Sequence, residues 1–445
     1  MLTYQDYEAA VEAGALSGFI AKAIREHTRS AAYREALVAD EYDHQRNPTV
    51  NNYTKFIAEH SANPLVNLTA ANNRIPSNFF HQLTVQRCAY LLGNGVSFAG
   101  SGEVKARLGA RFDRDFYQMA RLALIHGEAF ALWSGERLHV FPLTQFVPFY
   151  DVHTGALRAG ARFWRLDGGR PVSAVLYAED GATDYQIPDG EEAAVAVSEK
   201  RPYLTLGIET GDGGFEATAR ENFGALPIIH MYGSGLKQSA LCGMRPKIDA
   251  YDLIQSGFAN DLMDCAQIYW IVENCGGMRE SDLRDFLNRL TRDHVAVADT
   301  RGMGSEGGGV KPYVQEVPFE SRMAWLQFIR ASIYEGFGGL DVRALSAAKR
   351  TATEIDAAYQ PLDEAADDFE AQCTDAIQQL LGILGLEGEP VYKRNRVANV
   401  LEQTRTVMMA AELLDRETIL RHLPWITVDE VEEILKRDEG VGSRE

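Results

Sequence analysis

One short motif in the sequence has the spacing of a catalytic pair. Ser346 and Lys349 form an S-x-x-K pattern, and on a helix this spacing lets a lysine amine serve as base for a serine nucleophile. Patterns with two fixed positions recur often by chance, so a loop serine beside a basic residue is the alternative. A Ser/Lys-type hydrolase is therefore one hypothesis, and changing Ser346 to Ala would abolish its activity.

The same segment concentrates positive charge. Arg343, Lys349 and Arg350 lie close together, whereas the other cations are spread over the termini and over expected helix faces. Guanidinium and ammonium groups donate charge-assisted hydrogen bonds to phosphate oxygens, so this cluster is the candidate DNA contact. A solvated loop is the alternative, and the local sequence leaves both open.

Other common catalytic signatures are missing from the sequence. It has no Walker A motif, no HExxH pair and no paired CxxC, and its ten histidines include no i, i+4 pair. We therefore predict no metal site and no cofactor and, apart from the Ser/Lys alternative, no enzymatic activity.

An acidic stripe lies on one long helix expected after residue 352. Its members are Asp356, Asp363, Glu364, Asp367, Asp368 and Glu370. Such a stripe is most often a solvated helix face. In a ring it could instead line a surface or meet a neighbouring subunit.

Length and composition limit the class of protein. The chain has 445 residues, with 44 Lys and Arg against 63 Asp and Glu, and a formal charge of −19. The length suggests about two to four domains, and a hydrophobic content of 46 % is that of a packed globular protein. The negative charge argues against general affinity for nucleic acid, which normally needs a basic face.

Three further features concern location. No stretch reaches about 18 uninterrupted apolar residues, so no membrane span is predicted. The first residues lack the pattern of a signal peptide. The five cysteines are scattered, which argues against a disulfide framework and for a reducing compartment.

Hydrophobic periodicity predicts an α+β arrangement in the first half, a helical base with an antiparallel sheet inserted in it. The expected elements are a helix over 4–44, a loop over 47–74, a helix from Ser77 or Asn78 to Leu92, a helix over 103–126, a hairpin around 134–136, strands at 158–166 and 171–177, and an acidic, turn-rich stretch over 178–222.

The second half is expected to be mainly helical. The expected elements are a strand over 224–232, a helix over 246–272, a small module with a helix at 280–292 and strands at 294–298 and 310–317, a helix over 319–337 closed by Gly338 and Gly339, a long helix from about Ala352 to Leu384, and helices over 397–414, 416–422 and from 427 onward. Pro361 should kink the long helix, because proline removes a backbone donor and crowds the preceding turn.

The order of several segments resembles that of bacteriophage portal proteins, the ring-forming head-to-tail connectors of tailed phages. The segments are Asn72–Phe80 with Tyr90–Asn94, Gly224–Ile229 with Ile248–Asp252, Thr351–Ile355, and Leu414–Leu420 with Leu423 and Pro424. The likeness covers most of the chain and rests on the ordered set rather than on any single motif.

The resemblance implies a portal-like α+β architecture with an α/β wing, a two-helix stem that carries a small α/β clip, and a helical C-terminal crown. The implied parts are wing 1–242, first stem helix 243–272, clip 273–317, second stem helix 318–337, tunnel loop 338–352, long kinked wing helix 353–385 and crown 386–445. The tunnel loop would present Arg343, Lys349 and Arg350 to DNA.

The resemblance also implies a function and partners. A portal is a ring, usually of twelve subunits, at one capsid vertex, through which DNA is packaged and ejected. The implied partners are further copies of the chain, the terminase large subunit, major capsid and scaffold proteins, a head-completion or adaptor protein, and double-stranded DNA without sequence specificity, with no membrane. The implied location is the virion after assembly in the host cytoplasm. A low-order α+β scaffold that binds a partner is the third hypothesis.

Overall fold

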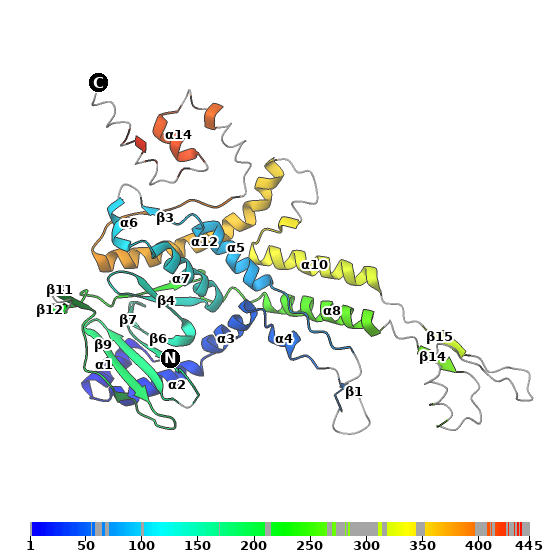
Figure 1. The fold of residues 1–445 in the computed structure, drawn as a ribbon, viewed down its shortest axis with the longest axis horizontal. Coiled ribbons are helices and arrows are strands. Elements are labelled where there is room, and N and C mark those ends of the chain that lie inside the picture. Colours follow the sequence, from blue (N-terminus) through cyan, green and yellow to red (C-terminus); the bar gives the residue numbers. More distant parts are fainter. Residues whose placement is uncertain are drawn as a thin grey trace, which may run out of the picture. The chain divides into compact units, whose positions relative to one another are not determined.

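The computed structural model describes two compact units. Described are residues 2–54, 56–57, 65–66, 71–98, 102–168, 170–209, 215–264, 269–272, 281, 284, 310–313, 318–343, 352–396, 407–409, 411, 414–423, 426, 431, 434–435 and 437. The first unit comprises residues 1–46, 78–246 and 332–445, and the second comprises 47–77 and 247–331. Figure 1 shows the helices and strands of both units and labels many of them.

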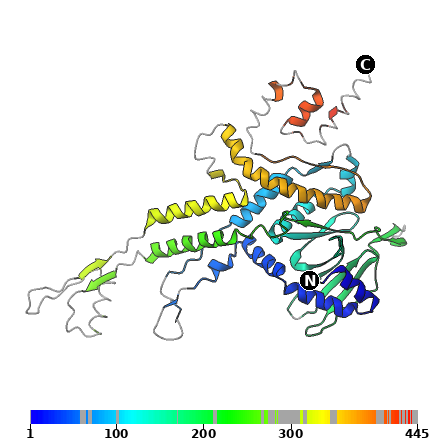
Figure 2. The same cartoon turned by 180° about the vertical axis from the view of Figure 1, so that it is seen from behind.

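The helices of the first unit flank several antiparallel sheets. They are α1 (Tyr4–Glu12), α2 (Leu16–Thr28), α3 (Ala31–Asp43), α5 (Phe79–Leu92), α6 (Gly102–Leu108), α7 (Phe112–His126), α12 (Ala352–Leu384) and α14 (Arg416–His422). The α+β class expected from the sequence is confirmed at this level. Figure 2 shows the same elements from behind.

The strands of this unit form two main sheets and two small ones. The five-stranded sheet has the order β10 (Val195–Ala196), β9 (Gly181–Ile187), β8 (Val172–Ala178), β7 (Leu157–Trp164), β6 (Phe146–Tyr150), and the three-stranded sheet has the order β13 (Ile228–Tyr232), β4 (Glu128–Trp133), β5 (Leu138–Pro142). The small sheets pair β11 (Leu204–Glu209) with β12 (Phe215–Glu221) and β16 (Pro390–Tyr392) with β3 (Val96–Phe98). Neighbouring strands are antiparallel throughout.

The five-stranded sheet is buried on both faces. Leu176 of β8 packs with Phe19 and Ile20 of α2 in one core cluster, whereas the next residue, Tyr177, belongs to a second cluster with Phe141 of β5. This alternation is the two-residue period of a strand. A third cluster joins α7 and α12 to the three-stranded sheet. The sheets therefore hold the first unit together.

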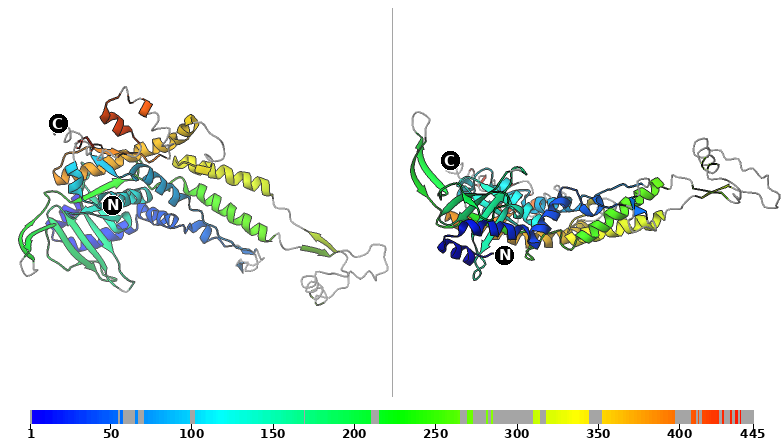
Figure 3. Two further views of the ribbon diagram at one scale, coloured as in Figure 1. Left: turned by 45° about the horizontal axis from the view of Figure 1, so that its top comes forward. Right: turned by 90° about the horizontal axis from the view of Figure 1, so that it is seen from below.

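The second unit is built around two helices, and the boundaries between the units fall within both. It contains α4 (Pro48–Asn51), residues 247–264 of α8 (Arg245–Asp264), residues 319–331 of α10 (Phe319–Phe337) and two short hairpins, β1 (Phe56–Ile57) with β2 (Leu65–Val66) and β14 (Tyr269–Val272) with β15 (Val310–Tyr313). Figure 3 gives two further views of these elements.

A ladder of hydrogen bonds ties the segment 71–77 to α8. The backbone N–H groups of Asn73, Ile75 and Ser77 donate to side-chain oxygens of α8 at 2.5, 3.0 and 2.9 Å. The acceptors are Asn260, Ser256 and Asp252 in that order, all of them buried. Two residues of extended chain and four residues of helix both advance about 6–7 Å, so the two periods stay in step.

Helices α8 and α10 pack against each other in the second unit. The rings of Phe258 and Phe319 lie 5.4 Å apart at 55°. Arg322 of α10 forms an ion pair with Asp261 of α8, and its guanidinium lies 5.8 Å from the Phe258 ring. One aromatic pair and one cation thus join the two helices.

Many expected elements are confirmed. Helices α5, α10, α12 and α14 and strands β4, β5, β7, β8 and β13 lie where the sequence predicted them. Asp415 caps α14 by accepting a hydrogen bond from the Thr418 N–H at 3.1 Å. Asn78 precedes α5, but its side chain makes no capping hydrogen bond. Helix α12 continues through Pro361, and its ribbon bends where yellow gives way to orange (Figures 1 and 2).

Three expected long helices are shorter in the structure. The helix predicted over 4–44 is three helices, because Gly14 at φ 64° ends the first and Ser30 caps the third. The helix predicted over 103–126 divides into α6 and α7 at Gly109, where φ is 81°. The helix predicted over 246–272 ends at Asp264, and residues 269–272 form strand β14.

The other differences concern strands and regions outside the description. The stretch 178–222, expected to be turn-rich, contains β9, β10, β11 and β12. The loop expected over 47–74 contains α4 and the β1–β2 hairpin. Of the strand expected over 310–317, residues 310–313 are confirmed as β15. The strand at 294–298 and most of the helices at 280–292, 397–414 and beyond 427 lie outside the described residues.

Candidate functional site

The three predicted DNA contacts are not brought together within the described residues. Arg343 is exposed in a short helical turn, and its backbone N–H donates to Asp341 Oδ1 at 3.0 Å. Lys349 and Arg350 lie outside the described residues, as does Ser346 of the proposed Ser/Lys pair. The cationic cluster and the catalytic pair therefore both stay predictions.

One side chain of α5 holds the described start of this segment. Gln86 Nε2 donates to the carbonyl oxygen of Leu340 at 3.0 Å, and the Leu340 N–H donates to Gln86 Oε1 at 2.9 Å. A single amide thus satisfies both backbone groups of one residue, as a neighbouring strand would. We call this pair of hydrogen bonds the Gln86 clamp.

Two glycines let the chain leave α10 beside the clamp. Gly338 has φ 61°, and a Cβ on it would lie 2.7 Å from the carbonyl oxygen of Pro361. A Cβ on Gly339 would overlap a methyl group of Leu83. The Arg87 guanidinium donates to the carbonyl oxygen of Phe337, the last residue of α10. The turn after α10 is therefore fixed against both α5 and α12.

An apolar cluster completes this anchor. Leu340 packs with Tyr90 of α5 and with Tyr359, Leu362 and Ala366 of α12, and all five are buried. The rings of Tyr90 and Tyr359 are stacked at 6.0 Å and 26°. The loop predicted over 338–352 therefore starts from a rigid, apolar base. The sequence showed the helix-closing glycines, but nothing local in it indicates that Gln86 contacts Leu340.

Next to this apolar cluster, the carboxylate of Asp363 on α12 accepts hydrogen bonds from three side chains. The Tyr90 hydroxyl donates to Asp363 Oδ1 at 2.5 Å, and Arg394 donates to the same oxygen at 3.0 Å. Arg396 donates to Asp363 Oδ2. Burial raises the pKa of Asp363, but the hydrogen bonds from Tyr90, Arg396 and Arg394 outweigh it, so the pKa lies below its usual value. The carboxylate is therefore held in its charged form.

The same two arginines reach further along α12. Arg394 pairs with Asp367 and, at 3.2 Å, with Glu370, and Arg396 lies 3.8 Å from Asp356. The favoured interpretation of this stripe as a solvated face holds for Asp356 and Asp367, which are exposed, but not for Asp363, which is largely covered. Two cations of the segment after β16 neutralise part of the stripe. The pairing could not be predicted from the sequence, since more than twenty residues separate each pair.

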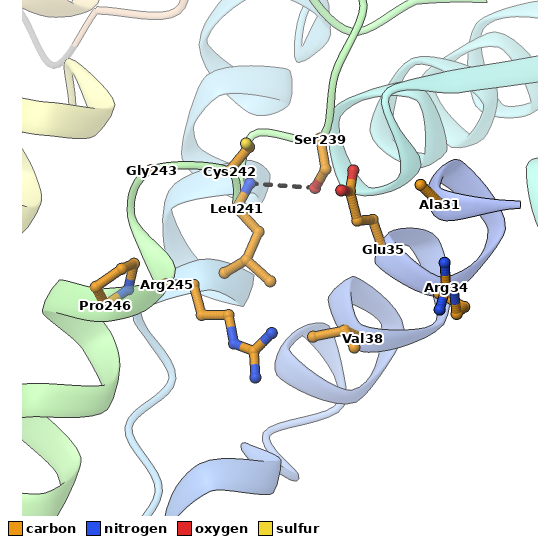
Figure 4. Close-up of a pocket in the computed structure, with 10 residues that line it drawn as sticks. All are labelled: Ala31, Arg34, Glu35, Val38, Ser239, Leu241, Cys242, Gly243, Arg245 and Pro246. Atoms are coloured by element: carbon orange, nitrogen blue, oxygen red, sulfur yellow. Dashed lines mark hydrogen bonds between the residues drawn. The ribbon is translucent and has the colours of Figure 1, made fainter.

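The first unit also contains a pocket of about 450 Å³ beside the start of α8. Its lining residues are Ala31, Arg34, Glu35, Val38, Ser239, Leu241, Cys242, Gly243, Arg245 and Pro246 (Figure 4). The Ser239 hydroxyl donates to the carbonyl oxygen of Ile125 at 2.5 Å and accepts from the Leu241 N–H at 3.1 Å. Because this hydroxyl is already engaged with the backbone, the pocket offers no activated serine.

The part of the chain that the structure describes holds neither a cluster of metal ligands nor a membrane-spanning helix. No three His, Cys, Asp or Glu side chains there are grouped so that they could hold a metal ion. None of the helices there is both long enough and apolar enough to span a bilayer.

Comparisons with known proteins point to one family. The family model described as "Phage portal protein, SPP1 Gp6-like" matches residues 38–443. The portal protein of Clostridium phage phiCD119 is 27 % identical over 429 residues, which is 92 % of each chain. Among solved structures, the neck of a native gene transfer agent particle computed with C12 symmetry has a TM-score of 0.40 at 13 % identity, covering 78 % of this chain and 90 % of that one. The neck of the empty particle, computed with C6 symmetry, has a TM-score of 0.43 at 12 % identity, covering 79 % and 90 %.

Proposed function

Because this chain belongs to the SPP1 Gp6-like family of phage portal proteins, we propose that it forms the portal ring of a phage capsid. The ring would have twelve subunits, stand at one capsid vertex of the virion and conduct double-stranded DNA during packaging and ejection. The family match over residues 38–443 carries this proposal. The protein would act as a structural component and would assemble in the host cytoplasm.

We propose the portal parts with the boundaries given by the resemblance. Residues 1–242 would be the wing, 243–272 and 318–337 the stem, 273–317 the clip, 338–352 the tunnel loop, 353–385 the long wing helix and 386–445 the crown. The second unit supports a stem that carries a clip. Helices α8 and α10 pack together there, and β14 pairs with β15 from Tyr269 and Tyr313 to Val272 and Val310. The chain between these strands, residues 273–309, would be most of the clip.

The anchor at 337–340 supports the tunnel-loop assignment. A loop that meets moving DNA needs a fixed root, and here the Gln86 clamp, Gly338 and the cluster around Leu340 supply one. Arg343 follows the root by three residues. We propose Arg343, Lys349 and Arg350 as the phosphate contacts of this loop.

Charge supports a channel that holds DNA weakly. Each chain carries −19, so twelve would carry −228. Net binding of DNA requires neutralised phosphates, and an acidic ring with a few cations per subunit would neutralise few of them.

The docking partners would be the terminase large subunit, major capsid and scaffold proteins, and a head-completion or adaptor protein. The terminase would hydrolyse ATP, since this sequence has no Walker A motif.

Particle mass tests the ring. Purified protein should sediment at about 590 kDa, the mass of twelve copies of a 49.3 kDa chain, and negative-stain images should show a central hole. A monodisperse 49.3 kDa species at high concentration, with or without scaffold protein, would refute the ring and favour the low-order scaffold.

DNA binding by that ring tests the loop. A variant with Arg343, Lys349 and Arg350 changed to Ala should bind a short duplex more weakly and with a shallower dependence on salt, because phosphate contacts set that slope. Its matched control removes three exposed cations of the proposed wing, Arg29, Arg165 and Lys200. Equal effects of the two triple variants would contradict the role of the loop.

A further inference from the structure

A single lysine connects α14 to the segment that follows β16. Lys393 Nζ donates to the carbonyl oxygen of Leu423 at 3.2 Å and to that of Ile426 at 2.6 Å. Leu423 is the C-terminal cap of α14, and the last carbonyl groups of a helix lack helical partners and carry partial negative charge. A cation there supplies both hydrogen bonds and charge, so Lys393 docks α14. We call residues 393–396 the strap.

The same strap is fixed to Tyr90 of α5. The Asn395 N–H donates to the carbonyl oxygen of Tyr90 at 2.7 Å, and Arg396 Nε donates to the Tyr90 hydroxyl at 3.0 Å. Just after α5, Asn94 Nδ2 donates to the carbonyl oxygen of Lys393 at 2.9 Å. Three residues of chain reach at most about 11 Å, so the contact with α14 and the contact with Tyr90 share one short stretch of backbone.

Tyr90 in turn belongs to the base of the proposed tunnel loop. Its ring stacks on that of Tyr359, and both residues are buried with Leu340. The Arg396 guanidinium lies 5.7 Å from the Tyr359 ring and pairs with Asp363, which also accepts a hydrogen bond from the Tyr90 hydroxyl. Contacts between neighbouring residues therefore lead without a gap from α14 through the strap to Leu340.

We propose that the strap couples the docking of α14 to the order of residues 338–343, where the proposed tunnel loop begins. The side chains of Arg394 and Arg396 are 25 % and 38 % exposed, so polar contacts near the surface hold the strap. Such segments open at a lower free energy than a core does. Docked α14 keeps the strap closed, and the closed strap holds Tyr90 against Leu340. Because such coupling is reciprocal, order at the start of the loop also favours docking of α14.

Hydrogen exchange of the native protein tests the coupling. Lys393→Met removes the ammonium group, so the α14 amides should exchange faster. The amides of residues 338–343 should also exchange at least fivefold faster, which is the lower end of typical coupling between sites. Arg396→Met should accelerate exchange of residues 338–343 as well, and adding Lys393→Met to it should change them little further, because both act through one strap. The matched control is Lys200→Met, which breaks an exposed ion pair with Asp180 and should leave residues 338–343 unchanged.

The outcomes separate this coupling from the proposed function. Unchanged exchange of α14 or of residues 338–343 in Lys393→Met would overturn the coupling. So would an effect that Lys200→Met reproduces or that spreads equally over β8, because its cause would then be global. The inference rests on the proposed function only in making the crown and the tunnel loop the coupled parts. All these contacts lie within one chain, so exchange tests the coupling even if sedimentation shows that no ring forms, and a ring without the coupling would leave the proposed function standing.

Discussion

The buried carboxylate of Asp252 makes the stability of the second unit depend on pH. Asp252 is fully buried on α8. Its Oδ1 accepts the Ser77 N–H at 2.9 Å and its Oδ2 accepts a hydrogen bond from Asn47 Nδ2. Burial raises its pKa to about 6, against the lowering effect of the hydrogen bonds from Ser77 and Asn47 and with a smaller contribution from the charge of Asp249.

The sign of the effect follows from the two pKa values. An unfolded aspartate loses its proton near pH 3.8, whereas folded Asp252 keeps its proton up to about pH 6. Unfolding between these values releases a proton, so raising the pH favours unfolding. The stabilisation is complete below about pH 4 and is lost as the pH rises through 6. Two pKa units correspond to roughly 3 kcal/mol in total, of which about 1.4 kcal/mol falls between pH 5 and pH 7.

Asp252→Asn should remove this dependence, because an amide does not titrate. Native-state hydrogen exchange of the α8 amides, corrected for intrinsic rates, measures the local unfolding free energy at pH 5 and pH 7. At each pH the local unfolding free energy of Asp252→Asn is subtracted from that of the unchanged protein. This difference should fall by about 1.4 kcal/mol from pH 5 to pH 7, which is a factor of ten in the opening constant.

A control one turn away tests the assignment. Asp249 accepts a hydrogen bond from the Thr49 hydroxyl at 2.9 Å and is only partly buried. Asp249→Asn should keep most of the pH dependence, since it removes only a minor contribution to the raised pKa of Asp252. Identical pH dependence in the unchanged protein and in Asp252→Asn would refute the reasoning.

Three further predictions concern the first unit. Gln86→Leu should loosen residues 338–343 by about 2 kcal/mol in hydrogen exchange, because both hydrogen bonds of the clamp are lost, and unchanged exchange there would contradict the clamp. Gly338→Ala should lower the free energy of unfolding by more than about 2 kcal/mol, whereas Gly155→Ala, with φ 70° and open space around it, should cost only about 1 kcal/mol of strain; equal costs in denaturant unfolding would rule out the contact with Pro361. Arg394→Met should cost about 1–3 kcal/mol because its carboxylate network is partly buried, while Arg165→Met, which breaks the exposed pair with Asp189 at 2.7 Å, should cost less than about 1 kcal/mol; similar small costs in thermal unfolding would refute a structural role for the network.

The hydrophobic periodicity of the sequence predicted an element well where a single period continued between two recognisable helix or strand ends. Helix α12 has an apolar stripe from Tyr359 to Leu380, and the structure buries that stripe in cores shared with α5, α7 and the three-stranded sheet. The periodicity gave the wrong element length where the helical pattern continued across a point at which the helix actually ends. Gly14 and Gly109 lie inside otherwise helical sequence, and only their positive φ values in the structure show that the chain turns there.

Most of the candidate site could not be predicted, because its contacts are distant in sequence. Gln86 meets Leu340 across 254 residues, and Arg396 meets Asp363 across 33. Neither contact leaves a periodic signal. The sequence predicted only a loop over 47–74 and a helix start at Ser77 or Asn78, because the buried partners of the ladder, Asp252, Ser256 and Asn260, are supplied by a helix far along the chain. The ladder uses matched periods of two and four residues, which become visible only once the two segments lie side by side.

The internal use of cations bears on how the proposed channel would act on DNA. Arg121 donates to Asp43 at 2.6 and 2.7 Å, Arg322 pairs with Asp261, and Arg394 and Arg396 are engaged with α12. Guanidinium groups committed to carboxylates have little left for phosphate, so these four arginines are poor candidates for DNA contacts.

The proposed tunnel loop differs from this background. Residues 338–352 hold three cations, Arg343, Lys349 and Arg350, against one carboxylate, Asp341. A duplex in the ring would therefore be attracted by the cations of the tunnel loops and repelled by the acidic surface of the rest of the ring. Because affinity for DNA rises with each phosphate neutralised, such an arrangement favours weak, movable contacts over a firm grip. Spreading the same three charges over the wing would leave the net charge unchanged but should remove this localised contact.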